Sequence, residues 1–125
     1  MTPKKILIAE DDKFLAAAYK AKLTKAEFDV LIAYDGEEAL LKVEQFNPDI
    51  ILLDIMMPKK DGLVVLKELR ANPKWQTVPI IIASNLGQKQ DKDQAMSLGA
   101  SGYVIKSDLS LTDLILQIHQ LLGQA

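Results

Sequence analysis

The sequence predicts an α/β domain in which one parallel five-stranded sheet is covered by helices on both faces. Three observations support this fold class. The chain has 125 residues, which suits one domain of ordinary size. Five short apolar runs, rich in β-branched residues and without polar alternation, have the character of strands buried on both faces. Segments with helical spacing separate the runs, and this alternation of strand and helix is typical of a parallel sheet.

The five apolar runs give the positions of the predicted strands. They are Ile6–Ala9, Val30–Ala33, Ile50–Leu53, Pro79–Ala83 and Tyr103–Ile105. Among the strand orders of doubly wound sheets, we expect the flavodoxin-like order 2-1-3-4-5. No change in composition marks a domain boundary, so we expect residues 1–125 to form a single doubly wound (βα)5 domain.

Apolar residues at a period near 3.6 predict the helices. Asp35 followed by Glu38 is a capping signal for the second helix, and an Asn-Pro pair ends both the second and the third. The fourth helical segment, Gln88–Leu98, has only a thin apolar stripe, so we expect it to be held weakly to the sheet. The apolar positions of the other helices are Phe14, Leu15, Ala18 and Leu23; Ala39, Leu40, Val43 and Phe46; Leu63, Leu66 and Leu69; and Leu111, Leu114, Ile115, Ile118, Leu121 and Leu122.

The composition excludes several classes of function. Lys and Arg number 15 and Asp and Glu number 17, a net charge of −2, so no basic excess favours direct binding to nucleic acid. The absence of cysteine excludes disulfides, thiolate nucleophiles and Cys-ligated zinc. No apolar run approaches the ~20 residues of a membrane helix, and no signal-peptide core lies near the N-terminus. We therefore expect a cytoplasmic protein without a membrane partner.

Polar residues immediately follow four of the predicted strands. In chain order they are Glu10, Asp11 and Asp12, then Asp54, Ser84 and Lys106. Ligands of open α/β sheets bind beyond the carboxyl ends of the strands, so we expect these side chains at one edge. Adjacent carboxylates repel one another unless a cation lies among them, and a set of oxygen ligands selects a hard cation, Mg²⁺ or Mn²⁺. A lysine and a hydroxyl beside such a cation suit phosphoryl transfer.

Four segments of the chain form a recognisable set. They are Ile6–Asp12, Asp54–Gly62, Ala83-Ser84 and Gly99–Lys106. In this order and on these strand ends, they resemble the receiver domains of two-component response regulators, in particular stand-alone receivers of the chemotaxis type. The resemblance extends from about Lys5 to Leu122.

The resemblance implies that Asp54 is the phosphoacceptor, which takes a phosphoryl group from a histidine of a sensor kinase or of a histidine phosphotransfer protein. It also implies a Mg²⁺ site. Asp11 and Asp54 would bind the ion directly, as would the backbone carbonyl of Met56. Glu10 would act mainly through a metal-bound water, and Asp12 would be a flanking charge.

The same resemblance implies roles for three further residues. Ser84 would donate a hydrogen bond to the phosphoryl group, Lys106 would pair with it, and Tyr103 matches the switch aromatic whose ring turns inward when the serine moves. Such a domain is not an enzyme but a phosphoacceptor that assists its own phosphorylation and dephosphorylation. Its signal would reach a downstream protein through the face formed by Gln88–Leu98, the fifth strand and the last helix. That face is also a possible homodimer surface.

The resemblance leaves some features open. Ser107 follows Lys106 where the family usually has a proline after a cis bond, so the geometry after Lys106 is open. Asn85 stands where a small alanine is usual, which leaves the lifetime of the phosphoryl group open. Because the sequence ends just past the last helix, we expect no attached output domain.

Two other functions compete with phosphoacceptance. A phosphatase of the haloacid-dehalogenase type also combines a carboxylate nucleophile with Mg²⁺, but it needs a second Asp two residues after the nucleophile, where this chain has Met56. A degenerate receiver that binds partners without phosphorylation is the alternative, and the complete set of acids, hydroxyl and lysine disfavours it. Among simpler structural roles, the Glu10–Asp12 run could be a solvated loop or a helix N-cap, and Tyr103 a half-buried strand aromatic.

Overall fold

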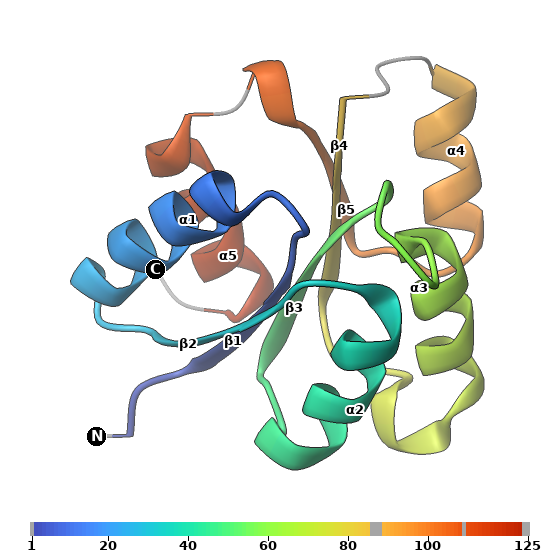
Figure 1. Cartoon of the computed structure of the whole chain (residues 1–125), viewed down its shortest axis with the longest axis horizontal. Helices are drawn as coiled ribbons and strands as arrows, with labels where there is room; N and C mark the ends of the chain where they lie inside the picture. The colour runs from blue at the N-terminus through green and yellow to red at the C-terminus, as the bar shows by residue number, and fades with distance from the viewer. Residues whose placement is uncertain (1, 86–88, 109, 124–125) are drawn as a thin grey trace.

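The computed structural model describes residues 2–85, 89–108 and 110–123. All strand pairs in its sheet are parallel and the strand order is β2-β1-β3-β4-β5, which confirms the predicted topology. Each strand begins and ends within one residue of its predicted run. In Figure 1, β4 and β5 run upward, with their carboxyl ends at the top of the view. The strands are β1 (Lys5–Ala9), β2 (Asp29–Ala33), β3 (Ile50–Asp54), β4 (Ile80–Ser84) and β5 (Gly102–Ile105).

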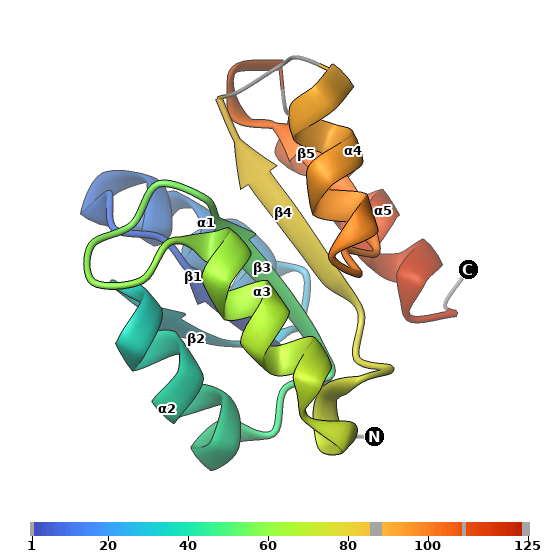
Figure 2. The same cartoon turned by 90° about the vertical axis from the view of Figure 1, so that its right-hand side faces the viewer.

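Helices cover both faces of the sheet, as predicted. Figure 1 shows α1 and α5 on one side, and Figure 2 shows α2, α3 and α4 on the other. Short 3-10 turns precede β4 at Pro73–Trp75 and follow β5 at Lys106–Asp108. The helices are α1 (Lys13–Lys25), α2 (Gly36–Phe46), α3 (Gly62–Ala71), α4 (Lys89–Ser97) and α5 (Leu111–Leu121).

Two hydrophobic clusters, one on each face, hold the helices to the sheet. In β1, Leu7 and Ala9 belong to the cluster beneath α2 and α3, whereas Ile6 and Ile8 belong to the cluster beneath α1 and α5. All four side chains are at most 1% exposed. Successive strand residues point to opposite faces, so a strand covered on both faces needs apolar residues throughout. This explains the uninterrupted apolar runs of the sequence.

Capping side chains fix where the helices begin. The N–H of Glu38 donates to Asp35 Oδ1 at 2.8 Å, and Glu38 Oε1 accepts from the N–H of Tyr34 at 3.2 Å. The capping signal before α2 is therefore confirmed. At the start of α5, Ser110 Oγ accepts from the N–H of Asp113 at 3.0 Å.

The buried face of α1 differs from the predicted one. Ala16, Tyr19 and Leu23 face the core, whereas Phe14 is 92% exposed and Ala18 is also exposed. Of the four apolar positions that mark this helix in the sequence, Leu23 is buried and Leu15 is partly buried, whereas Phe14 and Ala18 lie outside the buried face. Residues 16, 19 and 23 share one face at the helical period, and the sheet selects that face over the one that carries Phe14.

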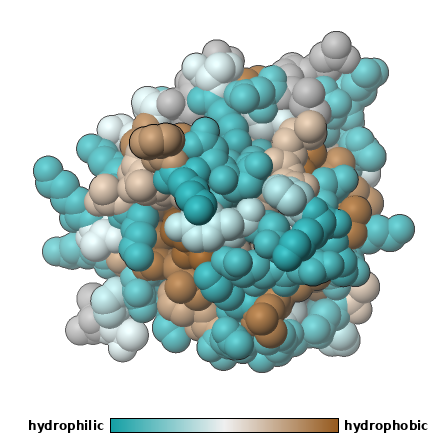
Figure 3. Space-filling view, viewed as in Figure 1, coloured by the Kyte–Doolittle hydropathy of each residue, from teal (hydrophilic) through white to brown (hydrophobic). Residues whose placement is uncertain are grey.

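The thin apolar stripe expected of α4 is confirmed, since Ala95 is its one buried residue in the part of the chain that the structure describes. The helix begins at Lys89, and Gln88 lies outside the described residues. Figure 3, viewed as in Figure 1, shows a largely hydrophilic surface with hydrophobic residues scattered over it. No helix among the described residues is long and apolar enough to cross a bilayer.

Candidate functional site

A pocket of about 390 Å³ lies at the carboxyl edge of the sheet. It gathers every predicted catalytic and metal-binding residue from the ends of β1, β3, β4 and β5. Its lining residues are Glu10, Asp11, Asp12, Asp54, Met56, Ser84, Asn85 and Lys106. Another pocket, of about 590 Å³, is lined by residues 2–4, residues 26–28 and His119, but it holds no cluster of acids. The smaller pocket is therefore the candidate site.

Three carboxylates converge in the pocket. Glu10, Asp11 and Asp54 each offer an oxygen atom, and these oxygens lie within 4.8 Å of one another. Glu10 and Asp54 are buried, whereas Asp11 is exposed at the mouth of the pocket. The position of Glu10 is fixed because its N–H donates to Ala33 O at 2.9 Å, which continues the β1–β2 pairing beyond the strand.

Asp12 lines the pocket, but its carboxylate is the N-cap of α1. Oδ1 of Asp12 accepts from the N–H groups of Phe14 and Leu15 at 3.0 and 3.1 Å. These hydrogen bonds direct the carboxylate toward the helix start rather than toward Asp54. The N-cap role, one of the simpler structural alternatives, accounts for Asp12 more specifically than a flanking charge does.

Lys106 joins the acids of two strands. Its Nζ atom lies 2.6 Å from Glu10 Oε1 and 3.0 Å from Asp54 Oδ2. Burial acts to lower the pKa of Lys106, but the contacts with the two carboxylates outweigh it, so the pKa lies above its usual value. The ammonium group is therefore a firmly held positive charge in the centre of the acidic cluster.

Glu10 is a buried acid of the site with a raised pKa. Burial raises its pKa to about 7, although contact with Lys106 and a hydrogen bond from the N–H of Asp12 act in the opposite direction. Its Oε1 atom is fully buried, and it has no hydrogen bond of good geometry among the described residues; its contact with Lys106 is an ion pair. Three carboxylate oxygens from Glu10, Asp11 and Asp54 lie close together against one ammonium group, and such an all-oxygen donor set suits a hard divalent cation. The residues present therefore fit Mg²⁺.

Met56 and Ser84 occupy the places that the sequence predicts for them. The Met56 side chain is 69% exposed, and its N–H donates to Asp54 Oδ1 at 3.4 Å. Ser84 is 1% exposed and ends β4, beside β5. Asn85, at the rim, is exposed. Tyr103 does not line the pocket; it is partly buried on β5 and packs against the cluster beneath α2 and α3.

The segment after Lys106 has a definite geometry. It forms the 3-10 turn of residues Lys106–Asp108, and the described residues contain no cis peptide bond. The usual cis bond before a family proline is thus not found at Lys106-Ser107 in this chain.

Sequence reasoning missed Tyr19, whose side chain is 2% exposed beneath the site. Burial raises its pKa, and the charges of Lys106, Glu10 and Asp54 all act on it. The only signal in the sequence was that Tyr19 shares one helical face with Ala16 and Leu23. The apolar Phe14, which lies on another face, obscured this signal. The close packing of Gly36 and Gly62 around the loop after β3 was also missed, because a sequence shows a turn glycine without its neighbours.

Comparisons with known proteins show the family of the chain. A sequence profile of the response regulator receiver domain matches residues 6–119. The probable transcriptional regulator ycf27 of Guillardia theta is 41% identical over 105 residues, which are 84% of this chain and 40% of that protein. The alkaline phosphatase synthesis transcriptional regulatory protein PhoP of Bacillus subtilis is 39% identical over 103 residues, 82% of this chain and 42% of that protein. The chain thus spans about two fifths of the length of these relatives.

A solved structure gives the same result. The receiver domain of a Francisella response regulator has 35% sequence identity and a TM-score of 0.90, and the match covers 96% of this chain and 97% of that one. The profile match extends over most of the chain, and the fold and the acidic pocket agree with it. The chain therefore belongs to the receiver domain family of two-component response regulators.

Proposed function

We propose that this receiver accepts a phosphoryl group on Asp54 from a phosphohistidine of a sensor kinase or a histidine phosphotransfer protein. The observation that carries the proposal is the contact of Asp54 Oδ2 with Lys106 Nζ at 3.0 Å, inside a pocket that also contains Ser84. A nucleophilic carboxylate, a fixed cation and a hydroxyl are thereby available to one incoming phosphoryl group. The alternative is a degenerate receiver that binds partners without this reaction.

In the proposed step, a carboxylate oxygen of Asp54 attacks phosphorus. The new O–P bond forms as the P–N bond of the phosphohistidine breaks, and the electron pair of that bond stays on the imidazole nitrogen, which then takes up a proton. Lys106 pairs with the phosphoryl oxygens in place of its contacts with the carboxylates, and Ser84 donates its hydroxyl hydrogen to another phosphoryl oxygen.

We propose Mg²⁺ as the cofactor, with Mn²⁺ as a substitute. Asp11, Asp54 and the Met56 carbonyl would hold it, and Glu10 would act through water. When bound, such an ion neutralises charge on the acceptor and on the phosphoryl oxygens. Receivers of this kind are not enzymes in the ordinary sense; this one would assist its own phosphorylation and dephosphorylation.

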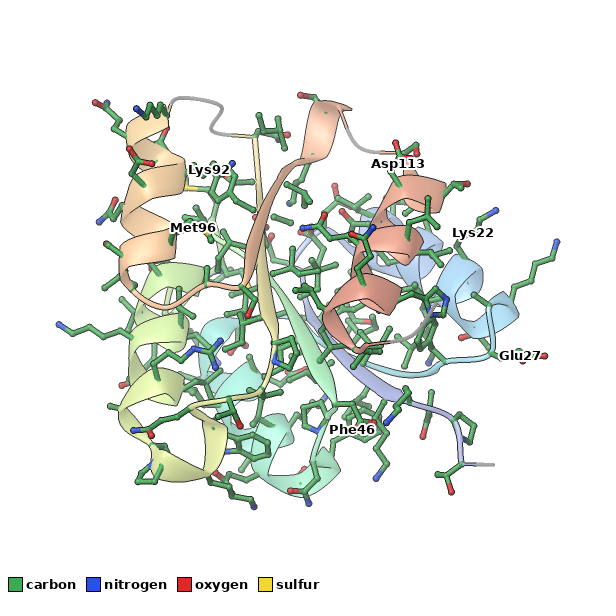
Figure 4. All side chains as sticks on the ribbon, turned by 180° about the vertical axis from the view of Figure 1, so that it is seen from behind. Lys22, Glu27, Phe46, Lys92, Met96 and Asp113 are labelled. Atoms are coloured by element: carbon green, nitrogen blue, oxygen red, sulfur yellow. The ribbon has the colours of Figure 1, made fainter. Side chains whose placement is uncertain are left out.

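For the output, we propose the face formed by α4, β5 and α5. α4 is held by one buried residue, Ala95, so a modest change at the end of β4 is enough to move it. In Figure 4, Lys92 and Met96 mark α4 and Asp113 marks the start of α5, on either side of β5. Tyr103, between them on β5, is the proposed switch residue. A downstream protein, or a second copy of the chain, is the proposed partner of this face.

We propose that residues 1–125 form one receiver domain that works in the cytoplasm and binds no nucleic acid itself. Two of the relatives named above are called transcriptional regulators, and this chain covers about two fifths of each, 40% and 42%. Contact with DNA would therefore belong to parts of those proteins outside the matched region.

Intact-mass spectrometry after incubation with acetyl phosphate and Mg²⁺ tests the proposed function. The wild-type chain is expected to gain the mass of one phosphoryl group, and Asp54→Asn is expected to gain none. Asp29→Asn is a matched control, because it makes the same change at an exposed aspartate of β2 outside the pocket, and it is expected to gain the phosphoryl mass as the wild-type chain does. No gain in the wild-type chain would favour the degenerate receiver.

A further inference from the structure

The loop between β3 and α3, residues 55–61, contains Met56, which lines the pocket and whose backbone carbonyl is the proposed Mg²⁺ ligand. Ile55 and Met57 are buried in the core cluster, at 5% and 9% exposure, with exposed Met56 between them. Ile55 O accepts from the N–H of Met57 at 3.1 Å and from the N–H of Gly62 at 2.9 Å. The backbone at Met56 is thus fixed from within its own loop.

A second support comes from the start of α2. The N–H of Gly36 donates to Pro58 O at 3.4 Å, and the carboxylate of Asp35 lies 3.7 Å from Lys59 Nζ. A Cβ atom on Gly36 would lie 2.1 Å from Lys60 O and 2.6 Å from Lys60 Cβ. The first turn of α2 therefore lies directly against the loop, with no room for a side chain.

The backbone conformation of Gly36 does not explain why this residue is glycine. Gly36 is the first residue of α2 and has no left-handed φ angle, unlike Gly99 and Gly123. Alanine is favoured over glycine within a helix, because glycine loses more backbone freedom on folding. The close approach of Gly36 to the backbone of Lys60 is the feature that requires glycine.

From this contact we infer that Gly36, which lies outside the pocket, is a positioning residue for the metal site. Because Gly36 has no side chain, α2 packs closely against the β3–α3 loop and holds it in the position from which the Met56 carbonyl would reach the bound ion. This inference rests on the proposed function, because it assumes that Met56 binds Mg²⁺. Since Mg²⁺ demands near-ideal octahedral geometry, a shift of this loop by about 1 Å is expected to weaken binding.

The test compares Gly36→Ala with Gly102→Ala. The Cβ added at Gly102 meets the end of the Gln117 side chain, which can rotate away, and Gly102 is not in the β3–α3 loop. Mg²⁺ dissociation constants are measured by amide chemical-shift titration of the folded protein, and urea midpoints are measured in metal-free buffer. We expect Gly36→Ala to weaken Mg²⁺ binding about tenfold and Gly102→Ala to leave it within about twofold.

A third variant separates positioning from stability. Lys59 has a φ angle of 70°, which glycine adopts freely, so Lys59→Gly removes the ion pair with Asp35 without adding atoms or strain. We expect weaker Mg²⁺ binding, by about twofold to threefold, with an unchanged urea midpoint. This variant decides the question if Gly36→Ala does not fold.

Three results would overturn the inference. The first is that Gly36→Ala folds and binds Mg²⁺ with the affinity of the wild-type chain. The second applies if Gly36→Ala does not fold: it is that Lys59→Gly binds Mg²⁺ with unchanged affinity. In both cases the proposed function stands. The third, absence of Mg²⁺ binding by the wild-type chain, would overturn the proposed function as well.

Discussion

The Nζ atom of Lys106 lies 3.0 Å from Oδ2 of Asp54, although a whole strand separates the two residues in the sheet. Asp54 ends β3 and Lys106 follows β5, so the lysine side chain passes over the end of β4. On that end lies Ser84, which is buried. The contact therefore links three strand ends. A group bound to Asp54 that breaks the contact with the Lys106 ammonium alters the surroundings of β4 and β5 together.

Replacing Lys106 tests the electrostatic balance of the site. Lys106→Met leaves Glu10 and Asp54 as buried carboxylates without their cation, so the free energy of unfolding in metal-free buffer is expected to fall by ~2 kcal/mol. Urea denaturation with EDTA measures it. Lys60→Met, which breaks an exposed pair with Glu68, should cost less than ~1 kcal/mol. Equal losses in the two variants would contradict the account.

Asp11 and Asp12 are adjacent in sequence but are expected to respond in opposite ways. Asp11→Ala should weaken Mg²⁺ binding about tenfold without loss of metal-free stability, because it removes a ligand and relieves repulsion among carboxylates. Asp12→Ala should cost about 1 kcal/mol of stability, because it removes the N-cap of α1, and should affect Mg²⁺ binding little. Amide shift titrations and urea midpoints of both variants measure this. Similar losses of Mg²⁺ affinity in both would count against these roles.

The raised pKa of Glu10 predicts a pH dependence of stability in metal-free buffer. Its pKa is about 7 in the folded protein against 4.5 for an ordinary glutamate, so between these values the folded state binds a proton that the unfolded state does not. The contribution of Glu10 to stability is therefore present below pH 4.5 and is lost as the pH rises through about 7.

Chemical denaturation in EDTA at several pH values between about 5 and 8 checks this dependence. The wild-type free energy of unfolding should fall with rising pH, and the slope should be smaller in Glu10→Gln, which cannot titrate at this position. Parallel profiles for the two proteins would exclude Glu10 as the source of the dependence.

Phosphorylation is expected to be transmitted to α4 and β5. With beryllofluoride and Mg²⁺ as a phosphoryl mimic, amide exchange should change within residues 89–97 and 102–106, because a coupling free energy of 1–3 kcal/mol suffices to move a weakly held helix. Asp54→Asn under the same conditions is the control and should show no change. If the wild-type changes stay at residues 10–12 and 54–61, the proposed output face does not operate.

The sequence predicted the site well because the site depends on topology. Once the apolar runs are taken as parallel strands, their carboxyl ends must meet, and this alone brings Asp54 near Glu10 and Lys106. The features that the sequence could not predict depend on how a helix is rotated about its axis and on close contacts between residues far apart in the chain. The buried face of α1 requires knowing which side the sheet covers, so Phe14 was placed inside and Tyr19 was missed. The N-cap bonds of Asp12 and the contact of Gly36 with Lys60 depend on distances that no residue type reveals.

The identity of the acceptor residue is the central claim, and chemical mapping tests it most directly. After incubation with acetyl phosphate and Mg²⁺, borohydride reduces an aspartyl phosphate to homoserine, and peptide mass spectrometry then locates the altered residue. The account predicts homoserine at the position of Asp54 and unaltered aspartate at Asp11, Asp12 and Asp61. Homoserine at any of those other positions, with Asp54 unaltered, would contradict it.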